Sequence, residues 1–280
     1  MKFVITLIML FYTFGVFAQH EYKFNEEHIK QNGISEILTF TYNLETGDSV
    51  LTIHDWYDTT GNLLKEIVYN EKGEVKNKCI SEIDSNRLIS RQFVFMGQDS
   101  IYTTIQYAYN KNNVLTSYKQ LNPDGTIVHH YKKKYNKKGQ NTRMYKNRYD
   151  FQGFLLTQKY FYRKDGQIKK IKSYSETGNL SSTRNYQYDK NRNLIALHQI
   201  VNSNKQLIFN NTYNQKNQKI EIFFPKKIIK IHNDILITGE TEEKRIYNYE
   251  TEGNLLEERT FENGKLISQK KFFYKKFGTK

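Results

Sequence analysis

One turn signal recurs at intervals of 12 to 14 residues along most of this chain. Each copy is an aromatic residue, a short polar step, a glycine and an aliphatic residue two places after the glycine. Gly153, Gly166 and Gly178, for example, are 13 and 12 residues apart. Turn signals at this interval, with no helical period between them, are typical of consecutive β-hairpins. The predicted repeat-turn glycines are Gly61, Gly73, Gly125, Gly139, Gly153, Gly166, Gly178 and Gly253.

The turn Asn122-Pro123-Asp124-Gly125 shows the physics of one copy. Proline fits the second position of a type I turn, and glycine supplies the left-handed backbone that closes the loop. The residues that flank each loop should then be cross-strand neighbours, and aromatic-to-aliphatic pairs of this kind contribute about 0.2 to 1 kcal/mol each. The predicted pairs include Leu121 with Ile127, Tyr149 with Leu155, and Tyr174 with Leu180.

Side chains of a strand alternate between two faces, so steps of two residues test whether the apolar pairs share a face. Ile168 and Tyr174 are separated by an even number of residues, and the same holds at most other copies. We therefore expect one apolar and one polar face. The copy at Gly153 is an exception, because the even separation is between Leu155 and Phe161 and not between Leu155 and the repeat tyrosine. This indicates a β-bulge or a strand with two apolar sides.

These patterns predict an all-β fold, a repetitive array of antiparallel hairpins that forms a long twisted or curled sheet over residues 34–280. Residues 19–33 lack the repeat and are expected to form a cap or an irregular segment, since repeat arrays need protected ends. The stretch from Glu221 to Thr238 is more hydrophobic and departs from the rhythm. It predicts a hairpin where the sheet is covered.

Residues 1–18 have the form of a secretory signal peptide, with Lys2, an apolar run and a small residue, Ala18, at the expected cleavage site. The run is short for a spanning helix. We therefore expect an exported protein, in the periplasm, on the outer surface or outside the cell. Cys79 is the only cysteine, so no internal disulfide can form, and the simplest role for it is a small apolar filler.

The phrase Y-D-x-x-G-N-L-L at Tyr57–Leu64, with the related YDFQGFLL and YETEGNLL, resembles the YD repeat of RHS-type proteins. The resemblance implies hairpins that wind into a shell, although this array is far shorter than those of the large RHS proteins. It is also similar to short arrays related to YwqK-like antitoxins. The resemblance implies a toxin-associated or immunity role as an alternative function.

No phosphate-binding loop, HExxH motif or nucleophile elbow occurs in the sequence. His129 and His130 are adjacent, so a strand points them to opposite faces, where they cannot share one ion without a bulge. His54-Asp55-Trp56 suits either a sugar-binding groove or packing at a strand end, of which packing is the simpler interpretation. We predict no catalytic residues, no metal site and no cofactor.

The sharpest functional signal is a basic band. Between Lys111 and Lys172 the chain has 16 Lys and Arg residues against three Asp, in a protein of net charge +14. Lysines interleaved with tyrosines suit a polyanion, through charge and stacking. The competing interpretation is that exposed lysines discourage aggregation of strands. The candidate polyanion-binding residues are Tyr131, Lys132, Lys133, Lys134, Tyr135, Lys137, Lys138, Arg143, Lys146 and Arg148.

The sequence thus predicts a non-enzymatic, exported binding or scaffold module of the cell envelope or extracellular space. Acidic glycans, other polyanions, another envelope component or a protein are the expected partners, and export disfavours nucleic acid. A membrane-spanning β-barrel is disfavoured as well, because a lipid-facing band needs strands of about 9 to 11 residues with a clean apolar side. Lys65, Lys170 and Arg184 interrupt that side.

Overall fold

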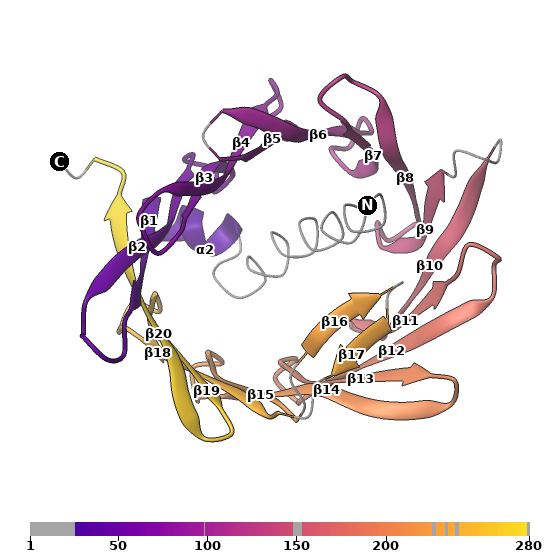
Figure 1. Cartoon of the computed structure of the whole chain (residues 1–280). Helices are drawn as coiled ribbons and strands as arrows, with labels where there is room; N and C mark the ends of the chain where they lie inside the picture. Colours follow the sequence, from indigo (N-terminus) through magenta and orange to yellow (C-terminus); the bar gives the residue numbers. More distant parts are fainter. Residues whose placement is uncertain are drawn as a thin grey trace, which may run out of the picture.

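The computed structural model describes residues 26–97, 99–147, 153–225, 228–232, 235–238 and 241–278. Eighteen strands of these residues form one antiparallel sheet, which closes on itself as a barrel (Figure 1). The all-β prediction is confirmed, and the predicted curled sheet is a closed ring. The strands are β1 (Ile34–Tyr42), β2 (Ser49–Tyr57), β3 (Leu63–Tyr69), β4 (Val75–Ile83), β5 (Ile89–Met96), β6 (Ser100–Tyr109), β7 (Leu115–Leu121), β8 (Ile127–Tyr135), β9 (Asn141–Asn147), β10 (Phe154–Tyr162), β11 (Ile168–Tyr174), β12 (Leu180–Tyr188), β13 (Leu194–Val201), β14 (Asn204–Tyr213), β15 (Lys219–Phe224), β18 (Glu243–Tyr249), β19 (Leu255–Glu262) and β20 (Lys265–Lys276).

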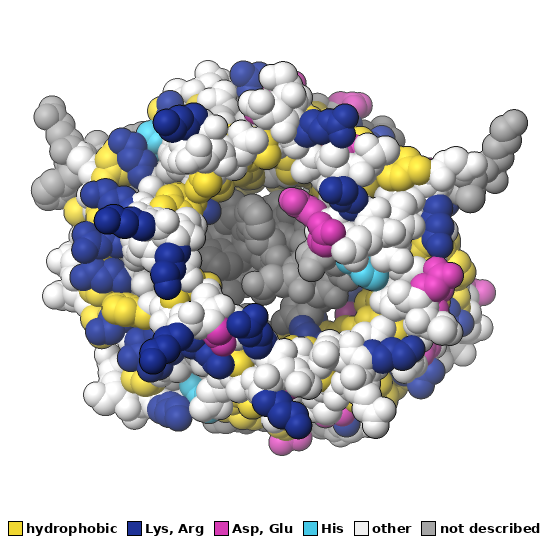
Figure 2. Space-filling view, turned by 180° about the vertical axis from the view of Figure 1, so that it is seen from behind, with side chains coloured by type: hydrophobic (Ala, Val, Ile, Leu, Met, Phe, Trp, Pro, Cys, Tyr) yellow, Lys and Arg dark blue, Asp and Glu magenta, His cyan; other side chains and the backbone are white. Residues whose placement is uncertain are grey.

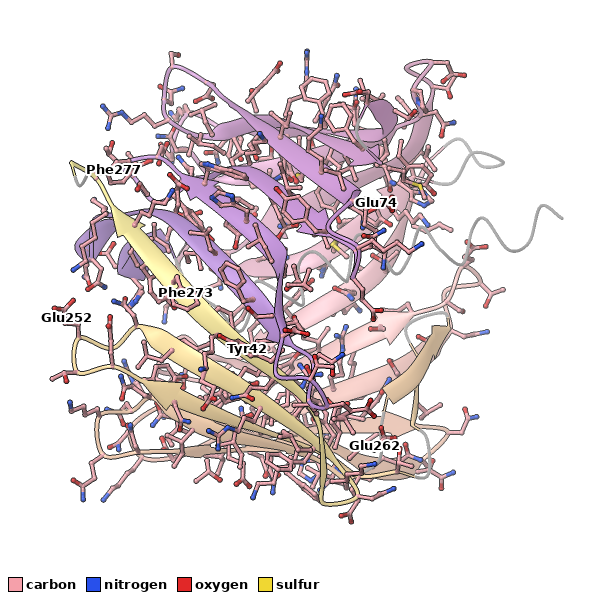
Figure 3. The ribbon with its side chains drawn as sticks, turned by 60° about the vertical axis from the view of Figure 1, so that its left-hand side comes forward. Tyr42, Glu74, Glu252, Glu262, Phe273 and Phe277 are labelled. Atoms are coloured by element: carbon pink, nitrogen blue, oxygen red, sulfur yellow. The ribbon has the colours of Figure 1, made fainter. Side chains whose placement is uncertain are left out.

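Closure depends on the first and last strands of the barrel. β1 pairs antiparallel with β20, with Ile37 opposite Tyr274 and Leu38 opposite Phe273. The outer side of this seam faces the viewer in Figure 3, where Phe273 is labelled. A closed barrel leaves no edge strand with unpaired backbone groups, so pairing with another chain through a free edge is removed.

The hairpins have the predicted register. Leu121 is opposite Ile127 and Tyr174 is opposite Leu180, as expected. Tyr149 lies outside the described residues, so its pair with Leu155 is untested. Immediately beyond each pair the register slips by one residue, and eleven hairpins share this slip. The slip is a β-bulge next to the turn, which leaves one residue of the returning strand without a partner.

The bulge makes the prediction of a single apolar face wrong. In the β10–β11 hairpin, Tyr162 is opposite Ile168, but Phe161 is opposite Lys170, so Lys169 is the extra residue. An extra residue shifts the alternation by one step. Ile168 and Tyr174, which counting placed together, therefore face opposite sides of the wall. The bulge expected near Gly153 lies in β10, between Leu156 and Gln158.

The helix α2 (Glu26–Gln31) identifies the inner face of the barrel. It lies inside the ring of strands in Figure 1, within the range predicted to form a cap. Its Ile29 is 1% exposed and belongs to a buried cluster with Ile37 of β1 and Tyr57 of β2. These side chains therefore point into the barrel, and their neighbours along each strand point out. Residues 1–25, which include the predicted signal peptide, lie outside the described part.

Tyrosine side chains connect neighbouring turns at one end of the barrel. We call this end the tyrosine rim, and it holds the turns after β2, β4, β6, β8, β10, β12, β14 and β18. In the described chain, seven tyrosine hydroxyls donate to the carbonyl of the first residue of the preceding strand in the sheet. Five of the tyrosines recur at intervals of 25 to 27 residues, so the structural unit is a pair of strands. The seven are Tyr109, Tyr135, Tyr162, Tyr188, Tyr213, Tyr249 and Tyr274.

The residue after the tyrosine position organises several of the turns at this rim. The Asp58 carboxylate accepts hydrogen bonds from the backbone N–H groups of Thr60 and Asn62, at 2.8 and 2.9 Å. Asn110 and Asn136 do the same in their own turns. This local acceptor explains why Asp and Asn are equally suitable there.

The hydrophobic hairpin predicted between Glu221 and Thr238 has two parts. β15 belongs to the barrel, whereas β16 (Ile228–His232) and β17 (Ile235–Thr238) pair with one another as a separate two-stranded sheet. Figure 1 draws this hairpin within the ring of strands. Among the described helices, none is long and apolar enough to cross a membrane.

Candidate functional site

Acidic residues are missing from a large part of the barrel wall. From β5 to β14, no strand residue is Asp or Glu. The strands β8 to β11 nevertheless carry much of the basic band. The space-filling view shows dark blue side chains gathered on the flank that corresponds to these strands (Figure 2). This part of the wall cannot balance its charge with strand carboxylates.

The register decides which basic residues point outward. Cross-strand partners share a face, so the inner face runs from Asp55 through Glu66 to Cys79. Following the cross-strand partners through β5 and β6 shows that Tyr118 and Tyr131 are also on the inner face. Their rings stack with centroids 4.7 Å apart. The residues next to Tyr131 along β8 therefore face outward. They include Lys132 and Lys134, both exposed.

Four cations form one line across the outer wall. Lys134 of β8 is opposite Arg143 of β9. Arg143 is in turn opposite Lys159 of β10. Lys159 is opposite Lys172 of β11. We call these four residues the outer cation row. Neighbouring strands are about 4.8 Å apart, so the row spans roughly 14 Å.

The row costs the fold some stability, because like charges directly opposite each other on a sheet repel. Aromatic rings flank the lysines, and among the described residues no carboxylate forms an ion pair with them. The Nζ atoms of Lys134, Lys159 and Lys172 lie 5.3, 5.4 and 5.9 Å from ring centroids. Cation–π contacts of this kind offset part of the repulsion without cancelling the charge. The rings are those of Tyr145, Tyr174 and Phe161, respectively.

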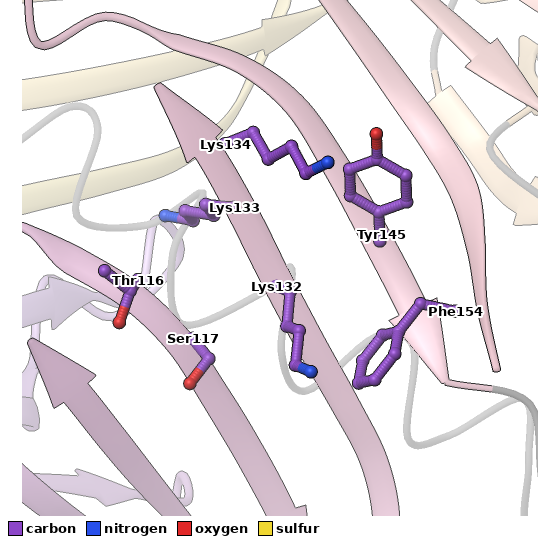
Figure 4. A pocket seen from close by; sticks show the side chains of 7 residues that line it. All are labelled: Thr116, Ser117, Lys132, Lys133, Lys134, Tyr145 and Phe154. Carbon is purple, nitrogen blue, oxygen red and sulfur yellow. The ribbon is translucent and has the colours of Figure 1, made fainter. Parts of the chain in front are cut away.

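A shallow open depression of about 380 Å³ adjoins the Lys134 end of the row (Figure 4). The Lys132 ammonium lies 3.9 Å from the ring centroid of Phe154, at one side of the depression. The Tyr145 hydroxyl meets the Arg143 side chain, and this hydrogen bond lowers the pKa of Tyr145, with a further contribution from Lys134. The depression thus combines cations, rings and hydroxyls. Its lining residues are Thr116, Ser117, Lys132, Lys133, Lys134, Tyr145 and Phe154.

The opposite side of the barrel is different, because several of its outer lysines and arginines have carboxylate partners. Ion pairs join Lys244 to Glu221 at 2.6 Å and Lys275 to Glu36 at 2.9 Å. Arg259 meets Glu257 at 2.9 Å. The cations of the row therefore differ from these in their surroundings, although both groups lie on the outer wall.

The structure divides the candidate residues among several places. Lys132, Lys134 and Arg143 lie together on the outer wall. Tyr131, Lys133 and Lys146 alternate with them and point inward. Tyr135 belongs to the tyrosine rim, and Lys137 and Lys138 are exposed in the turn that follows it. Arg148 lies outside the described residues.

The candidate set missed half of the row, Lys159 and Lys172, and the ring of Phe154. Both lysines belong to the basic band, but the candidates were chosen by closeness in sequence around Lys132. A usable signal was present in the turns. If the tyrosine pairs with the sixth residue after it, and the residue after that partner forms the bulge, the register alone places Lys134 opposite Arg143.

The adjacent histidines of β8 face opposite sides, as the alternation predicted. Burial, reinforced by Lys146, lowers the pKa of His129 to about 4, so this inward side chain is neutral at pH 7. Burial together with Lys119 and Lys132 also lowers the pKa of the outward His130. In the described chain, no three His, Cys, Asp or Glu side chains gather in a way that could hold a metal ion.

The His54-Asp55-Trp56 segment does not bring its three side chains to one face of the wall. Asp55 is fully buried on the inner face, so it is separated from its two neighbours. The His54 ring stacks on Trp56 with centroids 3.5 Å apart, and its Nε2 lies 2.7 Å from the Glu36 carboxylate. Lys65 occupies a position 4.7 Å from the same indole. The indole thus already contacts two side chains, which is consistent with a packing role.

Seven of the eight repeat-turn glycines adopt positive φ, the backbone region that side chains avoid. Gly153 has no such φ. At Gly61 a second constraint applies, because an added Cβ would lie 2.3 Å from the carbonyl oxygen of Glu26. The seven are Gly61, Gly73, Gly125, Gly139, Gly166, Gly178 and Gly253.

Fold and site together define a closed antiparallel β-barrel with a basic, ring-lined flank. The chain matches no family model and no curated protein. Among solved structures, it is similar to a porin-like protein from Bacteroides uniformis, at 12% identity and a TM-score of 0.43, over 86% of this chain and 98% of that one. A porin-like protein from Bacteroides vulgatus has 10% identity, a TM-score of 0.24 and the same coverage. TcdB2-TccC3 has 14% identity and a TM-score of 0.28, over 82% of this chain and 15% of that one. With TM-scores below 0.5, these likenesses say nothing about function.

Proposed function

We propose that the protein is an exported, non-enzymatic binding protein of the envelope or extracellular space, and that its outer wall binds polyanions. The outer cation row carries this proposal. Four cations directly opposite one another destabilise a sheet. A bound polyanion would remove that cost, and the flanking rings would add stacking.

The charged residues of the outer wall favour water over lipid as its surroundings. Lys65 and Lys170 lie on the outer face, as cross-strand partners of Trp56 and Phe161. An ionised side chain on a lipid-facing wall costs about 2 to 4 kcal/mol at the bilayer midplane. The proposal therefore includes a wall that faces water. Export, expected from the first eighteen residues, makes acidic glycans more suitable ligands than intracellular nucleic acid.

Retention on immobilised heparin, a generic sulfated polyanion, tests the function. The double variant Lys134→Glu and Lys159→Glu should elute at clearly lower salt than the wild type, because counterion release scales with the cations engaged. Lys244→Glu with Lys271→Glu is the matched control, since Lys244 of β18 and Lys271 of β20 lie on the outer face at the opposite side of the barrel and the change in charge is equal. Equal elution of the two double variants would contradict the proposal, as would no retention of the wild type.

A further inference from the structure

We infer that the ligand of the outer cation row is an anionic polysaccharide that lies across β8 to β11, perpendicular to the strands. This inference rests on the proposed function and specifies the ligand class and its direction. The row is a line, not a cluster. Its members come from four consecutive strands, one residue from each. A small anion would engage one or two of these cations, whereas an extended chain with repeating charges engages all four.

The direction follows from the arrangement of the charges. Along a strand, outward residues are two positions apart, so Lys132 and Lys134 are the outward cations of β8. Arg143 is followed on the outer face of β9 by Tyr145, which carries no positive charge. The path across the strands meets a cation on each of four strands, a longer run than the two outward cations of β8. A polymer lying along β9 would lose contact with positive charge after Arg143.

Aromatic rings and hydroxyls point to sugar as the chemistry between the charges. Phe161 is 42% exposed and lies beside Lys172. The depression beside Lys134 offers the Phe154 ring and the Ser117 side chain to one residue of the chain. Its volume of about 380 Å³ is in the range of small-molecule sites, which combine rings with a few polar groups. A pyranose ring stacks its C–H face on such rings while its hydroxyls find polar partners.

The centre of the row favours carboxylate or sulfate groups. Arg143 presents a planar fork, which pairs with such groups through two parallel hydrogen bonds. The adjacent Tyr145 hydroxyl is hydrogen-bonded to Arg143 and so helps to position the guanidinium. The flanking Lys134 and Lys159 act as point charges. Uronate or sulfated sugar units with regularly spaced anionic groups therefore match the row better than an uncharged glycan.

A chain-length series of oligouronates, measured by calorimetry with the mature protein, tests the direction. Affinity should rise with each added unit until the chain spans the row of roughly 14 Å, and then level off. Arg143→Gln should weaken the long oligomers about tenfold, the loss expected for a charge-assisted pair. Lys170→Gln is the matched control, because Lys170 is on the same wall outside the row, and it should change affinity less than threefold. Equal losses for both variants would overturn the row as the binding line.

Phe154→Leu tests the sugar chemistry. It keeps an apolar side chain but removes the ring, so it should weaken oligouronates several-fold and leave polyphosphate binding unchanged. Equal loss for both probes would overturn the stacking role. If polyphosphate or single-stranded DNA binds more tightly than every oligouronate, the ligand class is wrong while the polyanion function stands. If none of these probes binds, the proposed function fails as well.

Discussion

The hydroxyl of Tyr188 donates a hydrogen bond of 2.8 Å to the carbonyl oxygen of Ile168, across two strands that no turn connects at that end of the barrel. β11 and β12 are joined at the opposite end, so at the rim this bond ties the turn after β10 to the turn after β12. Because the seven tyrosines repeat the contact between β5 and β20, the rim behaves as a belt along most of the barrel. The tyrosine of the repeat is thus required for its hydroxyl as well as for its ring.

Tyr188→Phe should therefore destabilise the protein although the ring is kept. Loss of a single net hydrogen bond costs about 1 kcal/mol, and more if the Ile168 carbonyl finds no new donor. Tyr174→Phe is the control, since that ring lies on the outer wall beside Lys159. Urea unfolding of both variants measures the difference. A cost for Tyr174→Phe as large as for Tyr188→Phe would show that the belt is unimportant.

Gly61 and Gly73 provide a matched test of what glycine does in the turns. Both adopt positive φ, at 90° and 78°, so alanine at either position costs about 1 to 2 kcal/mol of strain. Only Gly61 also faces the Glu26 carbonyl, which a Cβ would approach to 2.3 Å. Gly61→Ala should thus cost clearly more in the free energy of unfolding than Gly73→Ala, where the added carbon meets open space. Equal costs would mean that α2 does not hold its place against this turn.

The hairpin register could be predicted from sequence because its cause is local. Pro123 and Gly125 define a loop whose geometry fixes Leu121 opposite Ile127, and no distant residue is needed. The closure of the barrel has no such signal. It depends on Ile37 meeting Tyr274, more than 200 residues away, and on the accumulated twist and bend of every strand between them.

The candidate site was partly predictable as well, because part of it depends only on local sequence. Counting charges found Lys132, Lys134 and Arg143, because composition does not depend on which face a residue takes. Side chains can be assigned to the inner or outer face only if the bulge after each turn is counted, and strict alternation leaves this bulge out. Lys133 was therefore grouped with its outward neighbours, and Lys159, one strand further on, was left out.

Asp58 should make stability depend on pH in the acidic range. Burial opposes its ionisation, but hydrogen bonds from Thr60 and Asn62 outweigh this effect and hold the pKa of Asp58 below its ordinary value. The stabilisation is therefore present above the unfolded-state pKa of about 3.9 and is lost as the pH falls through the lower folded-state pKa. Asp58→Asn keeps the acceptor, as the natural asparagines Asn110 and Asn136 do, and lacks the charge. The stability gap between wild type and variant should be constant above about pH 5 and narrow below pH 4. A gap that stays constant across the whole range would exclude this role.

The outer cation row should leave a signature in the salt dependence of stability. Lys159 stands between Arg143 and Lys172, so Lys159→Gln removes two repulsive contacts and should stabilise the unliganded protein by about 0.2 to 1 kcal/mol at low salt. At 1 M salt the Debye length is about 3 Å, and the gain should vanish. Lys244→Gln is the control, because it removes an ion pair with Glu221 and should bring no gain. Thermal unfolding at two salt concentrations measures both variants. If Lys159→Gln is destabilising at low salt, the four cations do not repel one another as their register requires.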